Sequence, residues 1–229
     1  MGKRSACEPR RQGDTPANRV PLGGKPVLRR RRKNSIASID TSAPGDYIFA
    51  MQEDLERILF DEATILARLD QIAEKIVADY RDRELTVIAV LNGSLIFMAD
   101  LLRRIPLPLK LDCLSVASYH GGTKSSGEVV FKQVMLPDVE GRHILILDDI
   151  LDSGLTLNAI RRKLEEAKPR SVRICVLLEK QIERAAPVQA DYVGFEIGNE
   201  FVVGYGLDYM ERYRNLPCIG VLRNDLITR

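Results

Sequence analysis

The segment from His143 to Leu157 constrains the fold of this chain more than any other stretch of its sequence. It begins with four aliphatic residues in a row, Ile144 to Leu147, a pattern typical of a strand buried on both faces, as in a parallel sheet. Two carboxylates, Asp148 and Asp149, follow where that strand is expected to end. After them the apolar period becomes helical. The segment therefore predicts a strand, a turn and a helix in an α/β sheet.

The turn between that strand and that helix has the composition of an anion site. It contains a third carboxylate, Asp152, and then four residues in a Ser-Gly-x-Thr pattern: Ser153, Gly154, Leu155 and Thr156. Open α/β sheets bind ligands beyond the carboxyl ends of their strands, and a turn that opens a helix offers unpaired N–H groups and hydroxyls to a phosphate. Because bare carboxylates would repel a phosphate, the neighbouring acids need hydroxyl groups, a proton or a divalent cation as partners.

Residues 147–156, Leu-Asp-Asp-Ile-Leu-Asp-Ser-Gly-Leu-Thr, resemble the loop that binds phosphoribosyl pyrophosphate (PRPP) in type I phosphoribosyltransferases. The alternative is a strand, turn and helix with a solvated acidic rim, as in receiver domains or P-loop proteins. The P-loop version fails because the chain has no Gly-x-x-x-x-Gly-Lys-[Ser/Thr] sequence. The resemblance implies a twisted, mainly parallel sheet flanked by helices, with a small C-terminal hood and a flexible hairpin flap.

Other periodic segments supply the remaining elements of such a sheet. One apolar face predicts a helix from Asp61, as its N-cap, to about Tyr80, and a second helix is expected to end near Arg104. Apolar or alternating runs predict strands at residues 86–91, 109–119, 129–134, 171–178 and 191–197. Strands that alternate with helices in this way favour a mainly parallel sheet with helices on both faces.

Charge divides the 229 residues into two unlike parts. Residues 1–33 contain 11 Lys/Arg and 2 Asp/Glu, whereas the rest contains 23 basic and 30 acidic residues. Residues 1–46 also lack a periodic apolar pattern, so we predict a disordered basic tail over 1–46 and one folded domain over 47–229. The run from Arg29 to Lys33 is also compatible with a nucleic-acid or anionic-surface patch, and the tail's composition with an organelle transit peptide.

Cysteine and histidine usage excludes several kinds of site. The four cysteines are far apart and form no Cys-x-x-Cys pair, which argues against a zinc site and against a disulfide framework. Cys113 and Cys175 lie in apolar runs, and reduced core thiols of this kind fit a cytoplasmic protein. His120 and His143 are too isolated for a metal cluster. No apolar run approaches the length of a membrane span, so no membrane partner is expected.

A second candidate anion site is Asn92-Gly93-Ser94, directly after the strand at 86–91. A Gly turn between a strand and a helix is a weak signal by itself. It resembles a loop of hypoxanthine phosphoribosyltransferases that contacts pyrophosphate through backbone amides. Asn92 stands where those relatives often have a cation, so the resemblance implies a backbone role for Asn92 and Gly93 and puts a charged side-chain role in doubt.

The C-terminal half resembles the same family at further positions. Ser118-Tyr119 resembles the start of the mobile flap. The segment from Glu200 to Tyr209, with Arg214 beyond it, resembles the C-terminal signature of hypoxanthine/guanine phosphoribosyltransferases. The resemblance implies that Lys180, Phe201 and Val202 bind the purine. It implies that Arg214 binds pyrophosphate and that Asp208 binds a metal ion.

The resemblance implies an enzyme of purine salvage, a pentosyltransferase that moves the 5-phosphoribosyl group of PRPP to N9 of hypoxanthine or guanine and releases pyrophosphate. Asp148 and Asp149 would bind the ribose hydroxyls directly or through a Mg²⁺ ion, and Asp152 would exchange a proton with the purine N7. Residues 153–156 would hold the 5′-phosphate. A homo-oligomer, dimer or tetramer, is also expected.

Two alternatives remain at this stage. Phosphoribosyltransferase folds also occur in regulators that bind nucleic acid, and the basic tail lends this some support, although a regulator would not need the purine-binding residues. The second alternative is a relative that prefers another base, xanthine above all. A nucleobase panel assayed with PRPP and Mg²⁺ distinguishes these alternatives.

The tail is expected to be dispensable for catalysis, because nothing in residues 1–46 resembles a site residue. Deletion of these residues should leave kcat and KM nearly unchanged, as steady-state kinetics of the two forms would measure. Weaker retention on heparin or RNA is compatible with this expectation. A loss of about tenfold or more in kcat/KM, with folding intact by circular dichroism, would contradict it.

Overall fold

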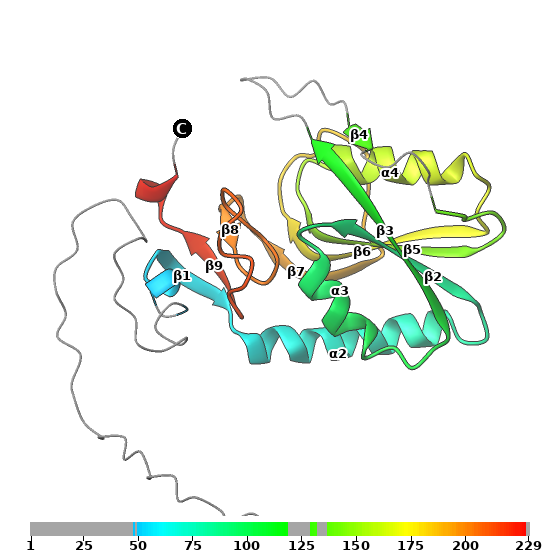
Figure 1. Ribbon diagram of the computed structural model, residues 1–229, viewed down its shortest axis with the longest axis horizontal. Coiled ribbons are helices and arrows are strands. Elements are labelled where there is room, and N and C mark those ends of the chain that lie inside the picture. The colour runs from blue at the N-terminus through cyan, green and yellow to red at the C-terminus, as the bar shows by residue number, and fades with distance from the viewer. Residues whose placement is uncertain (1–47, 49, 119–128, 132–136, 228–229) are drawn as a thin grey trace, which may run out of the picture. The chain divides into compact units, whose positions relative to one another are not determined.

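The computed structural model describes residues 48, 50–118, 129–131 and 137–227. Its larger sheet has six strands in the order β4-β3-β2-β5-β6-β7 (Figure 1). β4 is antiparallel to β3, and the other neighbouring strands are parallel. This confirms the mainly parallel sheet predicted from the sequence. The strands are β2 (Leu85–Leu91), β3 (Leu109–Ser118), β4 (Val129–Phe131), β5 (His143–Leu151), β6 (Ser171–Lys180) and β7 (Tyr192–Ile197).

Alternate residues of β5 face two different layers of the core. Leu145 and Leu147 pack in the cluster that contains α2 and α3, whereas Ile144 and Ile146 pack in the cluster that contains α4. Figure 1 shows α2 and α3 on one side of the sheet and α4 on the other. Because successive strand residues point to opposite faces, four aliphatic residues in a row are needed to fill both layers. The helices are α2 (Glu62–Asp79), α3 (Leu95–Leu102) and α4 (Leu155–Glu165).

The helix predicted over residues 61–80 is α2. Asp61 is its N-cap, and the Asp61 side chain accepts a hydrogen bond of 2.8 Å from the N–H of Thr64. This bond satisfies one of the donors that the first turn of a helix leaves unpaired. Ile65, Leu69 and Ile76 are fully buried on the apolar face that the periodicity predicted.

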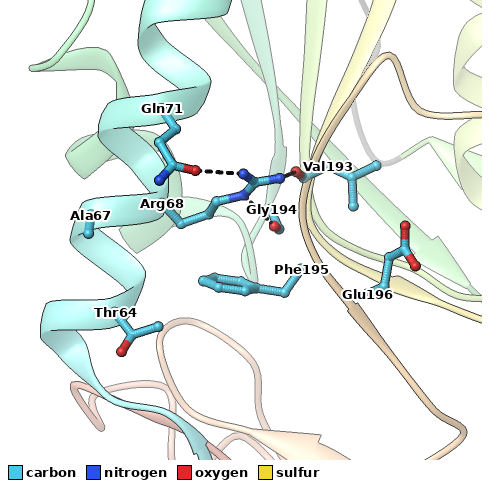
Figure 2. A pocket seen from close by; sticks show the side chains of 8 residues that line it. All are labelled: Thr64, Ala67, Arg68, Gln71, Val193, Gly194, Phe195 and Glu196. Atoms are coloured by element: carbon cyan, nitrogen blue, oxygen red, sulfur yellow. Dashed lines mark hydrogen bonds between the residues drawn. The ribbon is translucent and has the colours of Figure 1, made fainter.

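β7 is one of the two edge strands of the larger sheet, and Arg68 of α2 lies against it (Figure 2). The Arg68 guanidinium donates to the carbonyl oxygens of Gly194 (2.6 Å) and Val193 (3.1 Å), and Gln71 holds it from the same helix at 2.7 Å. An outer strand offers backbone groups to which another chain can pair. Arg68 therefore occupies acceptors on β7 with a charged side chain.

A second, three-stranded sheet forms the predicted hood. It consists of β1 (Leu55–Phe60), β9 (Ile219–Leu222) and β8 (Val202–Val203) in that order, followed by the short 3-10 helix η2 (Asn224–Leu226). The expectation of a purely C-terminal hood was incomplete, because β1 precedes α2 and pairs antiparallel with β9. Phe60 at the end of β1 stacks on Phe195 of β7 at 4.0 Å between ring centroids, which connects the two sheets.

Several predicted boundaries differ from the structure by one to a few residues; β6, for example, continues to Lys180 and not only to residue 178. β5 continues to Leu151, so Asp148 and Asp149 lie within the strand and not beyond its end. α4 begins at Leu155, so the second half of the predicted Ser-Gly-x-Thr turn is already helical.

Other expectations fall wholly or partly outside the described residues. The tail predicted over 1–46 lies outside them, as does most of the flap. Of the thiols expected in the core, Cys175 is buried and Cys113 is only partly buried. None of the described helices is long and apolar enough to cross a membrane.

Candidate active site

The two adjacent acids of β5 are held in an environment that opposes their charge. Asp148 is only 7% exposed, and its side chain accepts a hydrogen bond of 3.0 Å from the N–H of Asp149. Burial, reinforced by the charge of Asp149, raises the pKa of Asp148 well above its usual range. Burial also raises the pKa of Asp149, although hydrogen bonds and the Arg214 guanidinium act in the opposite direction. The pair is therefore suited to bind a cation or hydroxyl donors.

Two glycines allow the acid pair to meet loops from both sheets. A Cβ atom on Gly93, after β2, would lie 1.6 Å from Oδ2 of Asp149. A Cβ atom on Gly206, which has a φ of +107°, would lie 2.0 Å from the carbonyl oxygen of Gly93. Any side chain at either position would displace these groups. The hood loop, the loop after β2 and the acid of β5 thus meet at one point.

Arg214 and Asp208 belong to the same cluster. Their side chains form an ion pair of 2.7 Å, and both are about one-third exposed. Arg214 also donates to the carbonyl oxygen of Gly206 at 2.8 Å, and its own carbonyl oxygen accepts from the Gly206 N–H at 2.9 Å. A cation therefore lies beside the acids, where a strongly anionic group of a ligand would require it.

The segment predicted to bind phosphate opens α4 as expected. Gly154 is the N-cap with a φ of +79°, and no side chain caps the helix. The first N–H groups of a helix have no partner within the helix, so the backbone of residues 155–157 presents donors at the positive end of its dipole. Ser153 and Thr156 are half-buried on either side of the N-terminus. Their hydroxyls add donors of the kind that a phosphate binds.

The loop after β2 is shaped by its backbone and not by charged side chains. The Asn92 side chain is exposed. The backbone carbonyl oxygen of Asn92 accepts a hydrogen bond of 3.2 Å from the N–H of Leu95. Ser94 is fully buried and donates to the carbonyl oxygen of Val90 at 2.5 Å. The peptide bond between Leu91 and Asn92 is cis. The backbone role expected for Asn92 and Gly93 stays a prediction.

Lys180, at the end of β6, forms an ion pair with Asp152. Its Nζ atom lies 2.9 Å from Oδ2 of Asp152, and the Lys180 side chain is 11% exposed whereas that of Asp152 is 48% exposed. The ammonium has three donors and no acceptor, so at least one N–H direction is available beyond this pair.

An exposed aromatic surface comes from the hood. Phe201 is 41% exposed, and its ring meets Tyr209 edge to face at 5.5 Å. Val202 is buried and pairs with Val221 in the small sheet. An exposed aromatic face of this kind is suited to stacking on a planar ring.

The structure brings two groups of predicted residues together. In one, Asp149 contacts Asp148 and Gly93, and Arg214 with its partner Asp208 is linked to Gly93 through Gly206; the other is the pair of Asp152 and Lys180. Residues 152 to 156 follow the acid pair in the chain after Ile150 and Leu151. For the flap, Ser118 is the last residue of β3 and Tyr119 lies outside the described residues. The proposed roles of these residues stay predictions.

Sequence reasoning missed Gly206, whose contact with Gly93 assembles the cluster, and Tyr209 beside Phe201. Gly-Tyr-Gly at 204–206 was a usable signal for a tight turn. It also missed Glu179 and Arg184, which form an ion pair behind the phosphate segment. An acid and a base five residues apart carry no signal in a single sequence.

Comparison with known proteins assigns the chain to a family. The family described as "Phosphoribosyl transferase domain" matches residues 57–210. The chain belongs to the phosphoribosyltransferase family.

Individual relatives agree with this assignment. The hypoxanthine-guanine phosphoribosyltransferase of Staphylococcus epidermidis is 44% identical over 78% of this chain and 100% of its own length. The protein of that name from Bacillus subtilis is 46% identical over 76% of this chain and 96% of its own. A crystal structure of a hypoxanthine phosphoribosyltransferase from Staphylococcus aureus superimposes with a TM-score of 0.75 at 41% identity, covering 79% of this chain and 98% of that chain. The mainly parallel, helix-flanked sheet expected from the sequence is confirmed as the fold of this family.

The acid pair of this phosphoribosyltransferase should lower its folding stability at neutral pH. Because the folded-state pKa of Asp148 is raised, the native state binds more protons than the unfolded chain between the two pKa values. Stability is therefore lost as pH rises through that window and stays low above it. Asp148→Asn keeps an acceptor for the Asp149 N–H and removes the charge. The variant should have a higher Tm than the native protein at pH 7.5, by about 2–4 °C for each kcal/mol relieved.

Thermal melts of both proteins from pH 4 to pH 8 measure this difference, which should shrink toward acid pH. Asp138→Asn is the matched control, because it removes a carboxylate that is 71% exposed and pairs with Arg142 before β5. A native Tm higher than that of Asp148→Asn across the whole pH range would show that burial does not penalise this charge.

Proposed function

We propose that this chain transfers the 5-phosphoribosyl group of PRPP to N9 of a 6-oxopurine, hypoxanthine and also guanine, to give IMP or GMP and pyrophosphate. The observation that carries the proposal is the contact of Asp149 with Gly93, which Arg214 joins through the backbone of Gly206. The open N-terminus of α4 and the Lys180–Asp152 pair belong to the segments that follow β5 and end β6. The names of the relatives at 44–46% identity support the same activity. Nucleic-acid-binding regulators are not favoured, since the residues for base and phosphate binding are all present.

In the proposed reaction the bond between ribose C1 and the pyrophosphate oxygen breaks while N9 of the purine bonds to C1. The ribose passes through an oxocarbenium-like state, so positive charge develops at C1 and negative charge on the leaving pyrophosphate. Asp148 and Asp149 accept hydrogen bonds from the ribose hydroxyls and face the developing positive charge. The donors of residues 153–156 hold the 5′-phosphate, which fixes the ribose for attack.

Asp152 takes the proton that the purine loses from N7 as N9 forms its new bond. The Lys180 ammonium holds this carboxylate at 2.9 Å and balances its charge. Phe201 stacks on the base, and the backbone of Val202 contacts its edge. Arg214 and the N–H groups at Gly93 stabilise the leaving pyrophosphate.

The residues fit a divalent cation of the Mg²⁺ type. Asp148 and Asp149 offer hard oxygen ligands whose charges burial disfavours. No group of three or more His, Cys, Asp or Glu within the described ranges forms a closed metal cage. Mg²⁺ is commonly held by one or two carboxylates together with substrate phosphates, which agrees with this pattern. Asp208 does not group with the acid pair around one position and pairs with Arg214 at 2.7 Å, so as a metal ligand it would hold an ion apart from the acid pair, through its remaining lone pairs. When bound, the ion would neutralise charge on pyrophosphate.

Two further parts of the proposal concern the setting of the protein. A cytoplasmic location is inferred from the sequence and is compatible with the buried thiols of Cys175 and Cys218. A homo-oligomer stays a prediction.

Asp152 is expected to act in the chemical step and not in PRPP binding. Asp152→Asn retains an oxygen that Lys180 can donate to, and it removes the basic carboxylate. We expect kcat to fall by about 10²–10⁴-fold, while PRPP affinity measured by calorimetry stays close to the native value. Asp70→Asn, which removes an exposed carboxylate of α2 that pairs with Arg104, is the control. A collapse of PRPP binding with intact single-turnover chemistry would instead make Asp152 a ribose or metal ligand.

Lys180 is expected to select bases that have an oxygen at position 6. The purine O6 accepts a second hydrogen bond from the ammonium, whereas the amino group of adenine places a donor against it. Because Asp152 remains a partner for Lys180, the discrimination against adenine should lie below the roughly 10⁴–10⁵-fold of a site left wholly unpaired. A hydrogen bond to a charged group is worth about 1.5–3 kcal/mol, so we expect kcat/KM for adenine to be at least about 10-fold lower than for hypoxanthine.

The measurement is kcat/KM for hypoxanthine, guanine, xanthine and adenine with the native enzyme and with Lys180→Met. The variant should lose most of its preference for the 6-oxopurines. Lys163→Met is the control, because it removes a half-exposed ammonium on α4. An unchanged preference in Lys180→Met, or efficient use of adenine by the native enzyme, would leave Lys180 without a role in specificity.

A further inference from the structure

Two ion pairs diverge from the end of β6. Successive strand residues point to opposite faces, and here Lys180 reaches Asp152 whereas its neighbour Glu179 reaches Arg184. Glu179 is the partner of Leu151 in the register of β5 and β6. Leu151 directly precedes Asp152, where the turn that opens α4 begins. The Glu179 and Arg184 side chains are 14% and 21% exposed, so their charges are largely removed from water. A pair withdrawn from water to this extent loses hydration that its mutual attraction must offset, so it is a poor source of stability and its presence calls for another explanation.

Arg184 closes a turn of residues 184–188, which we call the support turn. Its guanidinium binds Glu179 through one terminal nitrogen and donates through the other to the carbonyl oxygen of Val188 at 3.2 Å. The N–H of Val188 in turn donates to the carbonyl oxygen of Ala186 at 2.9 Å. The side chain therefore joins both ends of the support turn to the end of β6.

The support turn holds the phosphate segment from behind. The N–H groups of Ala185 and Ala186 donate to the carbonyl oxygen of Ser153 at 3.1 and 3.3 Å. Val188, which is 2% exposed, lies under Gly154, where a Cβ atom would come within 2.7 Å of its Cγ1. The positions of Ser153 and Gly154 are thus set by the support turn, and no side-chain cap fixes the start of α4 instead.

We propose that the Glu179–Arg184 ion pair is a positioning pair, which fixes the support turn and through it the 5′-phosphate donors of residues 153–156. Neither side chain touches substrate. The inference rests on the proposed function, because it assigns a purpose to the geometry of that phosphate segment. A displacement of about 1 Å in a positioning group can lower a rate by about 10²-fold, so a small shift of the turn has a measurable effect.

The test compares the affinities of inosine 5′-monophosphate and inosine by calorimetry, since their ratio isolates the contribution of the 5′-phosphate. Arg184→Gln should weaken binding of the nucleotide by about tenfold or more and leave inosine within about twofold. In kinetics, KM for PRPP should rise while KM for the purine stays near its native value. Glu179→Gln, which keeps an oxygen acceptor for Arg184, should retain most of the native ratio.

Arg161→Gln is the matched control. Arg161 lines the same surface cavity as Arg184, but its guanidinium pairs with Glu165 one turn along α4 at 2.9 Å. This variant should keep the native affinities. If Arg184→Gln does not give a folded far-UV spectrum, Arg184→Lys takes its place. The lysine keeps the charge beside Glu179 and loses the planar fork that also reaches Val188, so a reduced nucleotide affinity is again expected.

The possible outcomes distinguish a failure of the positioning role from a failure of the proposed function. A folded Arg184 variant with the native ratio of affinities, or one that loses nucleotide and nucleoside binding in parallel, overturns the positioning role alone. A native protein that binds the nucleotide no better than the nucleoside overturns the proposed function, and the inference falls with it.

Discussion

Two like charges held side by side within β5, one buried and one partly buried, set the geometry of this site. Asp148 and Asp149 lie within the strand, where burial opposes their ionisation. Oδ2 of Asp149 occupies the space that a side chain would take at residue 93, and the Gly93 carbonyl does the same at residue 206. Both positions must therefore be glycine for the loops to close over the acids. Arg214, bound to the backbone of Gly206, is brought toward the acids by that closure, and its charge favours ionisation of Asp149.

The place of this contact follows from the topology of the sheet. β2 lies between β3 and β5, so the chain leaves β2 toward one edge of the sheet and returns on the other side of it. Open α/β sheets bind ligands where the connections of neighbouring strands diverge in this way, beyond the carboxyl ends of the strands. Gly93 follows β2 and Asp149 lies in the last part of β5, and the two meet at this place.

Local pattern was sufficient to predict the elements that the core buries on both faces. β5 and α4 were predictable because Ile144 to Leu147 fill two layers and because a helix start with glycine has a distinct sequence. β1 was missed because it has no alternation: of Leu55 to Phe60 only Leu55 is buried. Its pairing with β9 joins opposite ends of the domain, and a contact of such sequence separation leaves no trace in a local period.

The same distinction applies to the site. The residues proposed to contact substrate lie in short segments with recognisable composition, so their numbers were predictable once the family was suspected. The residues that place those segments were not. Glu179 and Arg184 gain meaning only from the turn they close, and Gly206 only from its contact with Gly93. Positioning depends on tertiary contacts between segments, and a single sequence does not show them.

The Lys180–Asp152 pair shows how one contact serves two states of the proposed reaction. Without a base, each of these side chains gives the other an opposite charge at 2.9 Å, so neither is left as a lone charge at the strand ends. A 6-oxopurine presents O6 and N7 side by side on one edge of the base. The ammonium can donate to O6 while the carboxylate faces N7, so the base joins the pair without breaking it. Because both groups are already held in place, less side-chain entropy is lost when the base binds. Base selection and proton transfer would then depend on a single ion pair between the ends of β5 and β6.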